Sequence, residues 1–266
     1  MREPLRPGSE LAPGYEVVAH LSRNQALDVY DLHSAERACR CVGKVVRPDR
    51  TDDRARARLV REGEVLLGLT HPHLVRAYEL LREPEPVLIL ETLTGETLGH
   101  LFDESGPLAS PDVAELGRQL CSALAYLHRR GWLHLDLKPG NVINDRGVAK
   151  VLDLSLTRPP GPVSPGLGTR EYAAPEQAAG GEATAATDVW GIGVLLYMAA
   201  AGRRPFDRGS EQFPQLTQRA PKVTGLPAGL CAAIDACLEP HPCDRPSIDD
   251  LATALGPHAH ELPAAA

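Results

Sequence analysis

The hydrophobic pattern of the chain changes partway along, and this change limits the folds that the chain can adopt. Residues 15–46 alternate apolar and polar positions in short β-branched runs, which predicts three strands. Residues 53–69 have the spacing of an amphipathic helix, and two further strands are expected near 75–81 and 86–91. The remainder is mainly helical, and its segment 187–201 is apolar on all sides, as in a helix at the centre of a domain. The sequence therefore predicts an α+β, bilobal fold, with a small β-rich first lobe, a larger helical second lobe and a cleft between them.

The length suits one domain of this kind. The chain has 266 residues, which is enough for one large domain or for two lobes. Residues 1–13 are rich in proline and glycine and are expected to be flexible, as is the tail 257–266. We expect the domain to span 14–256, with the first lobe at about 14–92 and the second at about 93–256.

Charge, hydropathy and cysteine spacing exclude several classes of function. A net charge of −7 does not favour nucleic acid or an anionic membrane as a general partner. No apolar run approaches the roughly 18 residues of a membrane span, and the first residues lack the apolar core of a secretory signal. The six cysteines have no spacing typical of a zinc site. We therefore expect a cytoplasmic protein with neither a membrane span nor a nucleic-acid partner.

The segment His134-Leu-Asp-Leu-Lys-Pro-Gly-Asn141 carries the groups that phosphoryl transfer requires. Asp136 can orient an attacking hydroxyl or accept its proton, and Lys138 can balance charge on the moving phosphate. Asn141 can bind a metal ion together with Asp153. A polar surface loop is the alternative, because Asp, Pro, Gly and Asn all favour turns.

The same segment resembles the catalytic loop of protein kinases. Other segments resemble further motifs of that family, in the family's order and over nearly the whole chain, which argues against coincidence. The resemblance implies ATP and Mg²⁺ or Mn²⁺ as cofactors, with Lys44 binding the α- and β-phosphates and Asp153 binding the metal. The further segments are Cys41-Val-Gly-Lys44 on the third strand, Asp153-Leu-Ser155, Ala174-Pro-Glu176 at the end of the activation segment, Asp188-Val-Trp-Gly191, and Asp244-Arg-Pro-Ser247, whose Arg245 pairs with Glu176 in family members.

Glu62 is the expected partner of Lys44. It lies on the apolar stripe of the predicted helix 53–69, where a carboxylate is costly to bury without a positive partner. The resemblance supplies Lys44 as that partner. Glu62 could instead reach solvent from the edge of the helix, and Glu64 is a competitor, but Glu64 lies off the stripe.

The remaining ATP contacts are implied by the resemblance alone. Plain core packing is the alternative, because these residues are mostly apolar. The residues are Val29 and Val42 above the adenine, Ile143 below it, Leu90 at the back of the pocket, Glu91 and Leu93 in the hinge, and Thr97 near the ribose.

The chain departs from the family pattern in three places. The phosphate-covering loop, residues 22–29, has no glycine at the family's three glycine positions, which hold Ser22, Asn24 and Leu27, so weakened ATP binding is expected. Leu135 replaces the arginine that normally receives a phosphorylated residue, so activation by loop phosphorylation is not expected. Leu154-Ser155 replaces Phe-Gly after the metal-binding aspartate.

The resemblance implies a Ser/Thr protein kinase whose partners are ATP and a protein carrying a serine or threonine. Lys138 and the step Gly168-Thr169 are typical of Ser/Thr members, in which Thr169 would contact Asp136 and Lys138. The missing glycines leave a pseudokinase open, as a nucleotide-binding or scaffolding regulator. A small-molecule phosphotransferase is a third hypothesis, which Leu135 suits but Arg245 does not.

Overall fold

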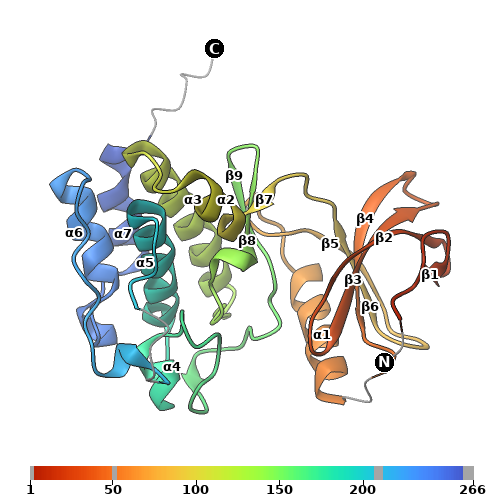
Figure 1. Ribbon diagram of the computed structural model, residues 1–266. Coiled ribbons are helices and arrows are strands. Elements are labelled where there is room, and N and C mark those ends of the chain that lie inside the picture. Colours follow the sequence, from red (N-terminus) through yellow and green to blue (C-terminus); the bar gives the residue numbers. More distant parts are fainter. Residues whose placement is uncertain (1–2, 50–52, 207–211, 260–266) are drawn as a thin grey trace. The chain divides into compact units, whose positions relative to one another are not determined.

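The computed structural model describes residues 3–49, 53–206 and 212–259. The chain divides into two compact units (Figure 1). The first comprises Met1–Thr94 together with Asp153–Ser155, and the second comprises Gly95–Leu152 and Leu156–Ala266. The first is β-rich and the second is mainly helical, which confirms the predicted α+β, bilobal class.

Within the described part of the first unit, six strands form one antiparallel sheet in the order β1-β2-β3-β4-β6-β5. Alternate residues of these strands bury one face of the sheet around Tyr30, Leu32 and Ile89. The helix α1 packs against β4, β5 and β6. The bounds are β1 Glu10–Ala12, β2 Tyr15–Arg23, β3 Leu27–Ser34, β4 Cys39–Val46, α1 Asp53–Leu67, β5 Ala77–Leu81 and β6 Val87–Glu91.

The strand β1 lies inside the segment 1–13 that was expected to be flexible. It pairs with β2, and just before it Gly8 donates its amide to the carbonyl of Val17 at 2.8 Å. Leu11 packs beside Gly43, where an added Cβ would come within 3.0 Å of the Leu11 side chain. The proline and glycine content of the segment conceals this pairing, because backbone hydrogen bonds require no particular side chain. The far end of the predicted tail 257–266 lies outside the described residues from 260 onward.

In the second unit, α5 is surrounded by other helices and contacts α3, α6 and α7 (Figure 1). Nearly all of its residues are buried, which explains why its sequence is apolar on every side. Among the described residues, no helix is long and apolar enough to cross a bilayer. The helices are α2 Leu98–Ser105, α3 Ser110–Arg129, α4 Pro175–Ala179, α5 Ala185–Ala201, α6 Ala228–Cys237 and α7 Ile248–Leu255, with 3₁₀ turns η1 Pro139–Asn141, η2 Pro214–Leu216, η3 Pro242–Asp244 and η4 Gly256–His258.

Short strands of the second unit frame the segment that carries the predicted catalytic residues. The strands β7, β8 and β9 form one antiparallel sheet, and β10 pairs with β11. The segment 134–141 ends at the residue before β8 begins. The bounds are β7 Glu96–Thr97, β8 Val142–Asp145, β9 Val148–Val151, β10 Gly161–Pro162 and β11 Glu182–Ala183.

Candidate active site

Asp136 lies at the centre of a compact group of hydrogen-bond donors in the second unit. Lys138 Nζ lies 2.6 Å from Asp136 Oδ2, and the Thr169 hydroxyl lies 2.7 Å from Oδ1. Lys138 Nζ also donates to Thr169 Oγ1 at 2.9 Å, which closes a triangle of three side chains. Asn141 Nδ2 donates to the Asp136 carbonyl at 2.9 Å. Asp136 is only 9% exposed, and these donors hold its carboxylate in one orientation.

The loop that carries Asp136 is anchored to α5 through Asp188. The buried carboxylate of Asp188 accepts the backbone amides of His134 and Leu135, both at 2.8 Å. It lies 2.8 Å from His128 Nε2, which must carry the proton because a carboxylate only accepts. Burial alone would raise the pKa of Asp188. The hydrogen bonds from His128 and from the backbone amide of Leu135 outweigh burial and lower that pKa.

His134 orients the residue that follows it by two positions. Its Nε2 lies 3.1 Å from the carbonyl oxygen of Leu152, so Nε2 carries the ring proton. The other ring nitrogen, Nδ1, is then free of a proton and accepts the backbone amide of Asp136 at 3.2 Å. The tautomer of His134 is therefore set by its two backbone partners.

Leu135, at the position where the family has arginine, is buried in an apolar cluster. It packs with Leu133, Val163 and Ala183, and Leu167 lies against the same cluster. Its backbone has a φ of 65°, in the left-handed region that side chains other than glycine rarely adopt. The cluster joins the loop that carries Asp136 to the segment 163–167 through apolar contacts, and it contains no cation.

The first unit contains a second charged group, centred on Lys44. Its ammonium donates to both carboxylate oxygens of Glu62, at 2.7 and 2.9 Å, and lies 3.5 Å from Asp153 Oδ1. Burial alone would lower the pKa of Lys44, but these two carboxylates outweigh burial and raise it. Of the two glutamates weighed as partners of Lys44, Glu64 is exposed and pairs with Arg82 at 2.7 Å.

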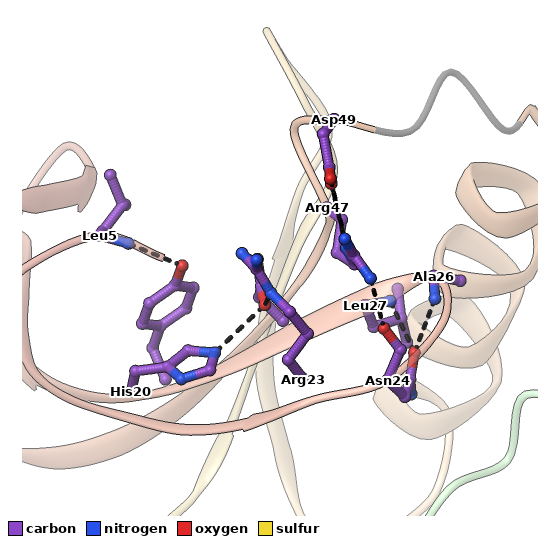
Figure 2. A network of polar contacts seen from close by, with 10 residues as sticks. Leu5, His20, Arg23, Asn24, Ala26, Leu27, Arg47 and Asp49 are labelled. Atoms are coloured by element: carbon purple, nitrogen blue, oxygen red, sulfur yellow. Dashed lines mark hydrogen bonds and ion pairs between the residues drawn. The ribbon is translucent and has the colours of Figure 1, made fainter. Parts of the chain in front are cut away.

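The resemblance places the phosphate-covering loop at the β2–β3 hairpin, and side chains hold the turn of this hairpin (Figure 2). Asn24 Oδ1 accepts the amides of Ala26 and Leu27, at 2.8 and 2.7 Å. Arg47 Nη1 donates to the Asn24 carbonyl at 3.0 Å, and the same guanidinium pairs with Asp49 at 2.8 Å. An asparagine that accepts these amides stabilises a tight turn without glycine. None of the residues 22–29, all of which the structure describes, has a positive φ.

An ion pair between Arg23 and the buried carboxylate of Asp28 supports the base of this hairpin. Arg23 contacts both carboxylate oxygens of Asp28, at 2.6 and 2.8 Å, and His20 Nε2 lies 3.1 Å from Oδ1. Asp28 is fully buried. Burial alone would raise its pKa, but the hydrogen bonds from Arg23 and His20 outweigh burial and hold the pKa below its ordinary range.

The residues assigned to the adenine and the ribose are divided between the units. In the first, Val29 is the cross-strand partner of Lys44, and Val42 is the partner of Leu90. Glu91 ends β6, and Leu93 follows it. In the second, Thr97 is the cross-strand partner of Ile143, and its hydroxyl also caps α2 by accepting the amide of His100 at 3.3 Å.

Asn141 in the second unit and Asp153 in the first each offer a ligand atom that a hard cation accepts. An amide oxygen and a carboxylate are ligands that Mg²⁺ accepts. Asn141 uses its amide nitrogen toward Asp136, which leaves the amide oxygen as the atom that could bind a metal. Asp153 has a φ of 60° and lies in the first unit beside Lys44.

A buried ion pair involves Glu176, where the resemblance places the end of the activation segment. Arg245 donates to both carboxylate oxygens of Glu176, at 2.8 and 2.9 Å, and its guanidinium lies 5.0 Å from the Trp190 ring centre. Further donation to the Ala186 carbonyl at 2.9 Å fixes the guanidinium to the start of α5. The pairing is the one that the resemblance implied for these positions.

Sequence reasoning missed several residues that organise these groups. Asp188 was matched to a motif without a role, and Gln177 was not considered. Gln177 follows Glu176 at the start of a short helix, and nothing in the sequence distinguishes it from a solvent-exposed glutamine. The hairpin side chains Arg23, Asp28 and Arg47 were also missed, because their partners are defined by strand pairing.

Comparison with known proteins identifies relatives over most of the chain. The protein kinase domain family matches residues 15–254. Serine/threonine-protein kinase PkaA of Streptomyces coelicolor is 38% identical over 221 residues, which cover 74% of this chain and 39% of PkaA. The DNA damage-responsive serine/threonine-protein kinase RqkA of Deinococcus radiodurans is 36% identical, covering 79% of this chain and 33% of RqkA. Probable serine/threonine-protein kinase PknB of Lactococcus lactis is 31% identical, covering 81% and 38%. The chain thus spans well under half the length of these relatives.

Proposed function

Because the chain belongs to the protein kinase family, we propose that it transfers the γ-phosphate of ATP to a serine or threonine hydroxyl of a protein. The triangle formed by Asp136, Lys138 and Thr169 carries the proposal, because it presents a carboxylate and an ammonium side by side. The relatives are named as serine/threonine-protein kinases, which supports the choice of serine and threonine.

In this proposal Asp136 acts on the attacking hydroxyl. The substrate oxygen forms a bond to the γ-phosphorus, the bond from that phosphorus to the β–γ bridging oxygen breaks, and ADP leaves. Asp136 aligns the hydroxyl and accepts its proton, and Lys138 stabilises negative charge on the transferred group. Thr169 holds both side chains in register.

Lys44 has the complementary role of binding the α- and β-phosphates of ATP. Its contact with Glu62 fixes the direction of the ammonium, and its raised pKa keeps it charged at neutral pH. Asn141 and Asp153 would hold Mg²⁺ or Mn²⁺, and the ion would neutralise charge on the phosphates. The adenine and ribose would contact Val29, Val42, Leu90, Glu91, Leu93, Thr97 and Ile143.

A pseudokinase is the second candidate, and the glycine-free hairpin is the observation that favours it. Leu27 places a bulky side chain where glycine would let the backbone approach phosphates closely. Against this, the hairpin keeps its turn without any positive φ, so a weakened ATP affinity is the consequence we favour. A small-molecule phosphotransferase is less well supported, because the relatives' names refer to protein kinases.

A transfer assay tests the proposal directly. The purified chain is incubated with γ-labelled ATP and Mg²⁺ or Mn²⁺, together with a generic basic protein and Ser/Thr peptides, and Asp136→Asn serves as the control. Labelled serine or threonine that disappears in the variant is the expected result. Absence of label in both forms, with ATP still raising the melting temperature, would instead support the pseudokinase.

A further inference from the structure

Gln177 connects three backbone segments of the second unit from a buried position. It is the third residue of α4 and is only 3% exposed. Its amide nitrogen donates to the carbonyl of Leu135 at 2.8 Å and to that of Leu167 at 3.3 Å. Its amide oxygen accepts the backbone amide of Ala174 at 3.1 Å. One side chain therefore bonds to the catalytic loop, the activation segment and the start of α4.

The bond to Leu135 matters because that residue immediately precedes Asp136. Leu135 has a φ of 65°, a strained conformation for a residue other than glycine, which persists only where the surrounding structure holds it. Asp188 accepts its amide at 2.8 Å, and Gln177 donates to its carbonyl. The Gln177 amide therefore holds the oxygen of the peptide unit between Leu135 and Asp136.

The hydrogen bond to Leu167 lies near Thr169, which forms a triangle of side chains with Asp136 and Lys138. Gly168 follows Leu167 with a φ of 98°, and a Cβ there would come within 3.0 Å of the Leu135 carbonyl and 3.2 Å of Gln177 Nε2. The activation segment thus passes directly over the amide of Gln177. The next residue, Thr169, donates to Asp136. Each acceptor of Gln177 therefore lies one or two residues from a member of the triangle.

We propose that Gln177 is a positioning residue for phosphoryl transfer, because it sets the separation of the two backbones that carry Asp136 and Thr169. It does not touch the reacting atoms and acts through the Leu135 and Leu167 carbonyls. This role rests on the kinase activity proposed above. Loss of the amide donors should leave the catalytic carboxylate present but misplaced.

Two variants and one matched control test the role. Gln177→Met removes both donors and keeps the length of the side chain. Gln177→Glu keeps an acceptor for Ala174 but turns an oxygen toward two carbonyls. Gln119→Met is the control, because Gln119 also donates to a carbonyl, that of Gly147 at 3.1 Å, and also accepts a backbone amide, that of Ala149 at 2.6 Å, while neither partner adjoins a member of the triangle in the chain.

Steady-state kinetics should separate the variants. We expect kcat to fall about 10- to 100-fold in Gln177→Met and further in Gln177→Glu, since small displacements of a catalytic group cost rates of this size. KM for ATP should stay within about twofold, because no ATP contact proposed above involves Gln177. Gln119→Met should lower kcat by less than about threefold, because neither of its backbone partners adjoins the triangle. An equal fall in kcat for the two methionine variants would overturn the proposal.

Hydrogen exchange provides a readout that does not depend on activity. Amides of residues 133–138 should exchange faster in Gln177→Met than in the wild type, and should be unchanged in Gln119→Met. If the wild type transfers no phosphate, the kinase proposal fails, while the exchange result still decides whether Gln177 holds the catalytic loop. Unchanged exchange in Gln177→Met would contradict that role even in an active enzyme.

Discussion

Lys44 and Glu62 form a buried ion pair between β4 and α1, although 18 positions separate them in the chain. The Glu62 side chain is completely buried, and the ammonium contacts both of its oxygens. The Lys44 ammonium therefore compensates the buried charge of Glu62, and the same ammonium also lies 3.5 Å from Asp153 Oδ1. The pair connects the sheet of the first unit to its helix and directs the ammonium that we assign to the phosphates.

Lys44→Met should lower the free energy of unfolding by about 3–5 kcal/mol, because it leaves an unpaired buried carboxylate. The double variant Lys44→Met, Glu62→Leu should recover most of that stability. It should still show no phosphoryl transfer. Urea unfolding and the transfer assay measure the two properties. Glu64→Gln is the surface control, expected to change stability by less than about 0.5 kcal/mol. Transfer by the double variant would contradict the role given to Lys44.

Arg245→Lys should destabilise the second unit nearly as much as Arg245→Met. The arginine contacts both oxygens of Glu176 and a carbonyl of α5 at once, and a lysine cannot reproduce this planar, two-pronged contact. A loss on the order of 10 °C in melting temperature is expected for a buried pair in a chain of this size. Full recovery of the melting temperature by lysine would show that charge alone is sufficient here.

Asp28→Asn should make the free energy of unfolding less dependent on pH in the acid range. The pKa of Asp28 in the folded protein lies below its ordinary value of 3.8, so its ionised form stabilises the fold above that value. This contribution is lost as the pH falls from about 5 through the ordinary value toward the folded pKa. Urea unfolding at several pH values should give the wild type a steeper decline than the variant. Asp103→Asn, at an exposed position on α2, should keep the wild-type slope.

Asn24→Ala should raise KM for ATP several-fold with a smaller effect on kcat. The change removes both hydrogen bonds from the hairpin amides to the Asn24 side chain, and the turn that should cover the phosphates loses its internal support. Asn144→Ala is a matched control, since Asn144 accepts the amide of Gly147 at 2.9 Å in the β8–β9 turn. Equal KM values for the two variants would argue against a phosphate-binding hairpin.

Treatment of the active protein with a phosphatase should leave kcat unchanged. Leu135 gives a phosphorylated residue no cation, and the apolar cluster with Val163 and Leu167 already holds the activation segment. Val163→Asp should lower activity by placing a charge in this cluster. Mass spectrometry before and after treatment confirms that any phosphate has been removed. A loss of kcat with dephosphorylation would show that another cation receives the phosphate.

Local patterns in the sequence were sufficient for much of the fold. The alternation in 15–46 predicted β2, β3 and β4, and the stripe in 53–69 predicted α1. The all-round apolar segment 187–201 is the buried helix α5. These features depend on side chains that repeat with the period of a strand or a helix, so neighbouring residues in the chain contain the signal. The catalytic-loop segment could be found for a related reason, since its chemistry lies within a few consecutive residues.

Tertiary structure decided contacts that no local pattern indicates. The apolar stripe of α1 favoured Glu62 over Glu64, but the packing of α1 on the sheet is what brings Glu62 to Lys44 and leaves Glu64 on the surface beside Arg82. Asp188 lies 53 positions and Gln177 lies 42 positions from Leu135, in the loop that both of them hold. A hydrogen bond between distant segments depends on how the chain folds back, and no periodic pattern encodes it. The sequence determined the elements and the chemical groups of this protein, and the tertiary structure decided their partners.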